Sequence, residues 1–84
     1  MYEVRLARSA RKELEALPDA VLARVARALD ALTSDPHPRG CKKLRGASDL
    51  WRVRVGDYRI TYHVDDGVRL VEVRAIRDRK DAYG

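Results

Sequence analysis

Two glycine–aspartate pairs divide the second half of the chain, and they constrain its fold more than any other feature. Gly56-Asp57 suits a type II′ turn, and Asp66-Gly67 suits a type I′ turn. Apolar and polar residues alternate around both pairs, in "LWRVRVGDYRITYHV" (50–64) and "LVEVRA" (70–75). Such alternation is typical of strands that bury one face. We therefore expect three consecutive antiparallel strands joined by two-residue turns.

Two-residue turns fix the register of these strands and the face on which each side chain lies. Arg54 then lies opposite Arg59, and Arg59 lies opposite Arg74. One face is apolar and holds Trp51, Val53, Val55, Tyr58, Ile60, Tyr62, Val71, Val73 and Ala75. The other face holds Arg52, Arg54, Arg59, Thr61, His63, Glu72 and Arg74. A slip of one residue would scatter the apolar set, which supports this register.

The first half of the chain predicts one strand and two helices. "YEVRLA" (2–7) alternates like a strand, and a helix capped by Ser9 follows through "ARKELEAL" (10–17). Pro18 ends that helix, and apolar spacings of three and four predict a second helix over 19–33. We expect an α+β fold, in which an antiparallel helix hairpin covers one face of a mainly antiparallel four-stranded sheet.

Length and composition favour one domain, residues 1–84, with a modest core: the chain has 84 residues, of which 45% are hydrophobic. No apolar run approaches the roughly 18 residues of a membrane span, and no secretory signal opens the chain. The single cysteine, Cys41, suits a reducing cytosol. We expect a cytoplasmic protein with no membrane association, no metal site and no small-molecule cofactor.

The charge is uneven and points to an anionic partner. The net charge is +5; residues 1–41 carry 7 basic and 6 acidic side chains, and residues 42–84 carry 11 and 7. Arginines directly opposite each other repel, yet clustered guanidinium groups suit phosphate oxygens. We predict that the basic face binds nucleic-acid phosphates; a merely solvated sheet face is the alternative.

Three segments of the sequence resemble the RelE/ParE superfamily of toxins from bacterial toxin–antitoxin pairs. They are "KKLRG" (42–46), "LWRVRVGDYRITYHV" and "RAIRDRKDAY" (74–83). The resemblance implies a RelE/ParE-like, microbial-ribonuclease-like fold. In the RelE branch it implies a metal-independent endoribonuclease, an mRNA interferase, which cleaves mRNA in the ribosomal A site by attack of the 2′-hydroxyl on the phosphodiester. It also implies an antitoxin partner whose acidic C-terminal segment wraps the toxin.

The resemblance also assigns roles to individual residues. The catalytic set that it implies is Arg52, Arg54, Arg59, Arg77 and Tyr83, and the RNA-binding set is Lys42, Lys43, Arg45, Arg74, Arg79 and Lys80. The best-known members carry lysines where this chain has Arg52 and Arg54. Arginine is a poor general base because its pKa lies above about 12, so the base stays open. His63, on the basic face opposite Leu50 and Leu70, is interpreted as a surface histidine.

Two other functions remain open at this point. A ParE-like protein would share the fold and inhibit DNA gyrase by binding, without a nuclease site. A non-catalytic module would bind RNA or the antitoxin only. Salt-sensitive RNA binding without cleavage would favour the module.

Overall fold

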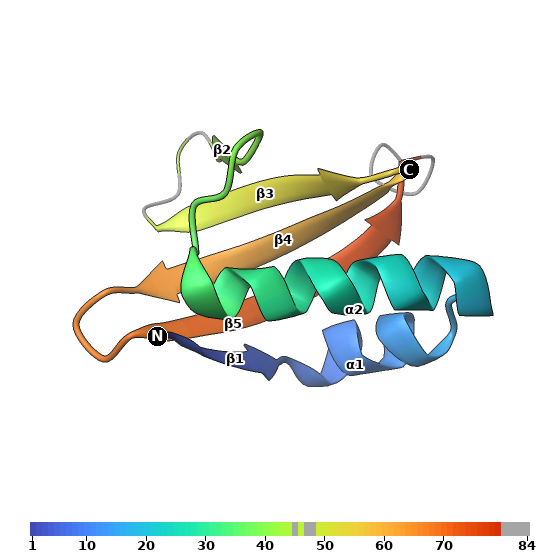
Figure 1. Ribbon diagram of the computed structural model, residues 1–84, viewed down its shortest axis with the longest axis horizontal. Coiled ribbons are helices and arrows are strands. Elements are labelled where there is room, and N and C mark those ends of the chain that lie inside the picture. The colour runs from blue at the N-terminus through green and yellow to red at the C-terminus, as the bar shows by residue number, and fades with distance from the viewer. Residues whose placement is uncertain (45, 47–48, 80–84) are drawn as a thin grey trace.

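The computed structural model describes residues 1–44, 46 and 49–79, and within these ranges it contains a five-stranded sheet with two helices on one face (Figure 1). The elements are β1 (Glu3–Leu6), α1 (Arg8–Glu15), α2 (Asp19–Ser34), β2 (Lys42–Lys43), β3 (Leu50–Val55), β4 (Tyr58–Asp65) and β5 (Leu70–Asp78). The strand order is β1-β5-β4-β3-β2, and β1 runs parallel to β5 while the other neighbours are antiparallel. The predicted α+β class is confirmed.

The sheet has one strand more than predicted. Lys42 and Lys43, expected as a basic segment beside the sheet, form the short edge strand β2. Lys42 lies opposite Arg52, and Lys43 lies opposite Trp51. The basic face therefore extends across one more strand.

The helices lie antiparallel over the sheet, as predicted (Figure 1). The N-cap of α1 is Ala7, so the prediction that Ser9 caps this helix is wrong. Ser9 lies inside α1, and its hydroxyl donates to the Arg74 carbonyl oxygen at 3.3 Å. Within the described ranges, neither helix combines the length and apolarity that a membrane crossing requires.

The core lies between the helices and the inner face of the sheet. Its buried side chains come from both helices and from the two central strands: Ala10, Val25, Leu32, Ile60, Tyr62, Val64, Val71, Val73 and Ile76. Trp51, Val53, Val55 and Tyr58 pack around this set, as expected from the alternation. Alternate residues of β3 and β4 therefore face away from the helices.

The first hairpin has the predicted register, from Val55 opposite Tyr58 to Trp51 opposite Tyr62. Gly56 has a φ of +59°, and a side chain there would meet the Arg24 guanidinium at 3.1 Å. Arg54 lies opposite Arg59, as predicted.

The second hairpin differs from the prediction, because its loop spans four residues, 66–69, rather than two. Asp65 pairs with Leu70. Oδ1 of Asp65 accepts hydrogen bonds from the backbone N–H groups of Gly67 (2.9 Å) and Val68 (3.3 Å). Aspartate side chains stabilise turns in this way, so the loop does not close as a two-residue turn. Tyr62 consequently lies opposite Val73 instead of Val71.

A β-bulge then changes which arginine of β5 lies opposite Arg59. Tyr62 pairs with Val73 and Thr61 pairs with Ala75, so Arg74 is the extra residue. Beyond the bulge Arg77, not Arg74, lies opposite Arg59. The bulge buries Ile76, whereas Ala75 is only partly buried. Isoleucine removes more apolar surface from water than alanine, which favours this phase change.

Tyr62 joins the centre of the sheet to the loop after α2. Its hydroxyl is buried and donates to the Pro36 carbonyl oxygen at 2.8 Å. Burial, with smaller effects of Cys41 and Asp35, raises the pKa of Tyr62 far above its usual range. The phenol therefore stays protonated in the folded protein and holds this loop against the sheet.

We expect Tyr62→Phe to lower the free energy of unfolding by about 1–2 kcal/mol near pH 7, because the Pro36 carbonyl loses its donor. Above pH 10 the unfolded tyrosine ionises while the folded one does not, so wild-type stability falls with rising pH. The phenylalanine variant lacks this loss, and the difference between the two proteins narrows. Urea unfolding at pH 7, 9 and 11 tests this; a constant difference across that range would contradict it.

Candidate phosphate-binding site

Four cationic side chains gather on the outer face of the sheet, the face away from the helices. Lys42, Arg52, Arg54 and Arg59, with Gly40, line a pocket of about 240 Å³. We call these five residues the cationic pocket. They come from β2, β3, β4 and the loop before β2, so pairing between strands holds the four cations together.

The cationic pocket contains two like-charged pairs that face each other directly. Lys42 lies opposite Arg52, and Arg54 lies opposite Arg59. Such pairs destabilise a sheet by about 0.2–1 kcal/mol each. The Arg54 side chain is also oriented by the hairpin, because its Nε donates to the Gly56 carbonyl oxygen at 2.9 Å. A phosphate in the pocket would relieve the repulsion and accept bidentate hydrogen bonds.

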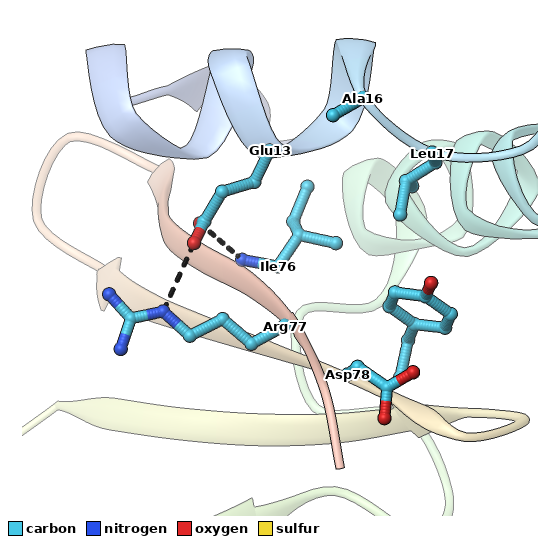
Figure 2. Close-up of a pocket in the computed structure, with 7 residues that line it drawn as sticks. Glu13, Ala16, Leu17, Ile76, Arg77 and Asp78 are labelled. Atoms are coloured by element: carbon cyan, nitrogen blue, oxygen red, sulfur yellow. Dashed lines mark hydrogen bonds and ion pairs between the residues drawn. The ribbon is translucent and has the colours of Figure 1, made fainter. Parts of the chain in front are cut away.

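Arg77 continues the row from Arg54 and Arg59 across a third strand, but it does not line the cationic pocket. Its Nε donates to Oε2 of Glu13 at 3.0 Å. Oε1 of the same carboxylate accepts the backbone N–H of Ile76 at 2.9 Å (Figure 2). The Arg77 guanidinium is thus held at the edge of β5 next to α1.

A larger pocket, of about 570 Å³, lies beside this ion pair between α1 and the end of β5 (Figure 2). Carboxylates and Arg77 form its polar part, and alanine, leucine, isoleucine and tyrosine form the rest. Its lining residues are Glu13, Ala16, Leu17, Tyr58, Ile76, Arg77 and Asp78.

Three other predicted residues that the structure describes, Arg74, Lys43 and Arg79, do not line the cationic pocket. Arg74 is exposed, and its Nε lies 2.6 Å from Oε1 of Glu72. Lys43 is exposed opposite Trp51, so strand alternation directs it to the helix side. Arg79 is exposed, and its backbone N–H donates to the Asp57 carbonyl oxygen at 2.7 Å. Arg45, Lys80 and Tyr83 lie outside the described residues.

The imidazole and phenol groups give no described general base at the cationic pocket. His63 is partly buried on the outer face, opposite Leu50 and Glu72, so the expectation of Leu70 as its neighbour is wrong. The pKa of Tyr62 is raised by burial, and that of Tyr2 is raised mainly by its hydrogen bond to Asp66. In the described residues no three His, Cys, Asp or Glu side chains gather as metal ligands.

Two residues of this region were not predicted from the sequence to belong to a site. Gly40, with a φ of +90°, forms part of the pocket wall in a loop expected only as a connection. Glu13 lies three residues after Ala10 on α1 and four residues before Leu17, which follows the helix. A carboxylate within an apolar stripe was the available signal.

Known protein families and relatives match this chain over nearly its whole length. The family model described as "ParE toxin of type II toxin-antitoxin system, parDE" matches residues 4–83. Toxin RelE of Mycobacterium tuberculosis is 32% identical over 83 residues, covering 98% of this chain and 86% of that protein. Toxin RelG of the same organism is also 32% identical over 83 residues, covering 98% and 95%.

Solved structures show the same fold. RelE in the archaeal RelE–RelB complex from Pyrococcus horikoshii has a TM-score of 0.83 and 32% identity, covering 93% of this chain and 94% of that chain. The toxin–antitoxin complex RelBE2 from Mycobacterium tuberculosis gives 0.82 and 32%, covering 93% and 98%. The chain therefore belongs to the family of ParE toxins of type II toxin–antitoxin systems, within the RelE/ParE superfamily.

Proposed function

We propose that this toxin of a type II toxin–antitoxin system is an endoribonuclease that cleaves mRNA in the A site of the translating ribosome. The observation that carries the proposal is the cationic pocket: four cations from three strands line one small cavity on a rigid sheet. Similarity to toxins named RelE supports it. The described residues that line the pocket include no carboxylate.

The bonds that form and break in the proposed reaction both belong to the RNA. The 2′-hydroxyl attacks the adjacent phosphorus, the bond to the 5′-oxygen breaks, and a 2′,3′-cyclic phosphate and a 5′-hydroxyl result. Negative charge grows on the phosphate oxygens in the transition state. Preorganised donors aimed at such charge usually give the largest catalytic contribution. We assign this role to Arg52, Arg54, Arg59 and Arg77.

Proton transfer needs a group that gives up and regains a proton. Arginine does not do so in proteins, because its pKa lies above about 12. Lysine can, and Lys42 is the one lysine among the described residues that line the cationic pocket. We therefore propose Lys42 for one proton transfer, and Tyr83, which the family resemblance implies, for the other.

An antitoxin is the proposed protein partner. RelE is bound to RelB in the complex from Pyrococcus horikoshii, and a toxin–antitoxin complex is solved from Mycobacterium tuberculosis. We infer a cognate antitoxin for this chain, with an acidic C-terminal segment that covers the cationic pocket. The net charge of +5 supports such a partner.

Inhibition of DNA gyrase is the second candidate, because the matching family model is described by parDE. Expression of the protein in bacteria without its antitoxin, followed by mapping of mRNA 5′ ends, separates gyrase inhibition from cleavage. Growth arrest with intact mRNA would favour gyrase, and neither arrest nor cleavage would favour a binding module.

We expect Arg54→Ala/Arg59→Ala to abolish cleavage, since it removes two facing donors of the cationic pocket. The protein is induced in bacteria without its antitoxin, and 5′ ends are mapped on a translated message and on an untranslated copy. Wild type should cut only the translated copy. Arg11→Ala/Arg27→Ala is the matched control, because it removes the same charge from exposed helix positions. Cuts by the Arg54/Arg59 variant, or their loss in the control, would contradict the assignment.

We expect Lys42→Arg to bind RNA within about twofold of wild type, because charge governs that affinity. Its single-turnover cleavage rate should fall by about 100-fold or more, because arginine cannot transfer the proton. Binding is measured on a 2′-O-methyl RNA, which lacks the attacking hydroxyl, and cleavage on ribosomes programmed with mRNA. An unchanged rate would remove Lys42 from proton transfer.

A further inference from the structure

We propose that Glu13 is a positioning residue: it holds Arg77 so that only the two terminal nitrogens of the guanidinium meet the RNA phosphate. The inference rests on the proposed nuclease function and adds a residue that acts on the reaction through Arg77. The contacts of the Glu13 carboxylate at the junction of α1 and β5 support this role (Figure 2).

Both oxygens of the Glu13 carboxylate bind consecutive residues of β5. Oε1 accepts the Ile76 N–H at 2.9 Å, and Oε2 accepts Nε–H of Arg77 at 3.0 Å. β1 pairs with β5 only as far as Val73. The Ile76 N–H therefore faces a side of β5 where the described chain supplies no strand, and Glu13 provides the acceptor. The carboxylate is fixed by a backbone donor as well as by an opposite charge.

Glu13 is also anchored by the helix that carries it. Its neighbours on the inner face of α1 are Ala10, which is fully buried, and Leu14, which packs against the core, as does Leu17 just after the helix. The Glu13 side chain is 27% exposed, whereas that of Arg77 is 55% exposed. The less exposed, doubly bonded carboxylate therefore sets the direction of the more exposed guanidinium.

The atom that Glu13 binds determines how Arg77 can bind phosphate. A guanidinium offers five N–H donors in a planar fork, along two bidentate edges. Because Nε is used by Glu13, the edge formed by Nε and one terminal nitrogen is closed to RNA. The edge formed by the two terminal nitrogens remains for the phosphate, because the hydrogen bond to Glu13 is made by Nε. Holding a donor in one orientation before the reaction is the general way that positioning lowers a barrier.

This role predicts an effect opposite to that of charge alone. A carboxylate near an RNA site repels phosphate, so its removal should strengthen binding if charge were its whole contribution. A positioning role instead predicts that Glu13→Gln slows cleavage although it removes a negative charge near the RNA. The glutamine oxygen can still accept the Ile76 N–H, so the strand keeps its partner while Arg77 loses its carboxylate.

The test is a double-mutant cycle with Glu13→Gln, Arg77→Ala and the two combined. Glu15→Gln, an exposed position of the same helix, is the matched control for charge. Single-turnover cleavage on programmed ribosomes is measured over a range of toxin concentrations. We expect Glu13→Gln to lower the maximal rate by about 10- to 100-fold with half-saturation within twofold. In the Arg77→Ala background it should cause no further loss.

Each other outcome has a distinct meaning. If Glu13→Gln lowers the maximal cleavage rate equally with and without Arg77, Glu13 acts on the fold. If Glu13→Gln cleaves faster than wild type, the Glu13 carboxylate contributes only its charge. Either result overturns the inference. Cleavage by Arg77→Ala at the wild-type rate would overturn the role of Arg77 and, with it, that of Glu13. No cleavage by wild type would instead overturn the proposed function.

A second measurement uses the wild-type protein and does not depend on folding of a variant. The Nε–Hε proton of Arg77 is followed by ¹⁵N NMR while 2′-O-methyl RNA is added. We expect its signal to persist in the complex while the terminal nitrogens shift. Loss of the bond to Glu13 upon RNA binding would overturn the inference.

Discussion

Burial of alternate residues on β4 is the constraint on which the rest of the structure depends. Ile60, Tyr62 and Val64 are at most 2% exposed, and β4 lies between β3 and β5. Burying one such side chain contributes about 1.5–3 kcal/mol, which exceeds the roughly 0.2–1 kcal/mol lost by facing like charges. The core therefore holds Arg59 on the outer face beside Arg54. The site is cationic because packing tolerates its repulsion.

Short-range signals predicted the first hairpin and failed on the second. Gly56 and the alternation around it determine the pairing of Arg54 with Arg59, because the turn is short and the flanking strands are regular. The β4–β5 pairing depends on the Asp65 side chain, which holds a four-residue loop, and on a bulge at Arg74. Ile76, larger than Ala75, was the visible sign that the alternation changes phase.

The residues of the candidate site also differ in whether the sequence predicts them. Arg52, Arg54 and Arg59 follow from strand alternation alone. Gly40 and Glu13 enter through loop geometry and helix packing. The apolar stripe around Glu13 marked it as unusual, but no local pattern of residues specified its partner. Glu13 and Arg77 are 64 positions apart in the chain, and their contact requires α1 to lie at the end of β5. The functional roles drawn from family resemblance are independent of these contacts.

The way the exposed side of β5 is closed has a consequence for the behaviour of the protein in a crowded cell. A strand edge with unpaired backbone groups is a template for another chain and a route to aggregation. Beyond the end of β1, the Ser9 hydroxyl and the Glu13 carboxylate satisfy backbone groups of Arg74 and Ile76. Within the described residues, side chains rather than a further strand satisfy these groups and thus block edge-to-edge association at this point.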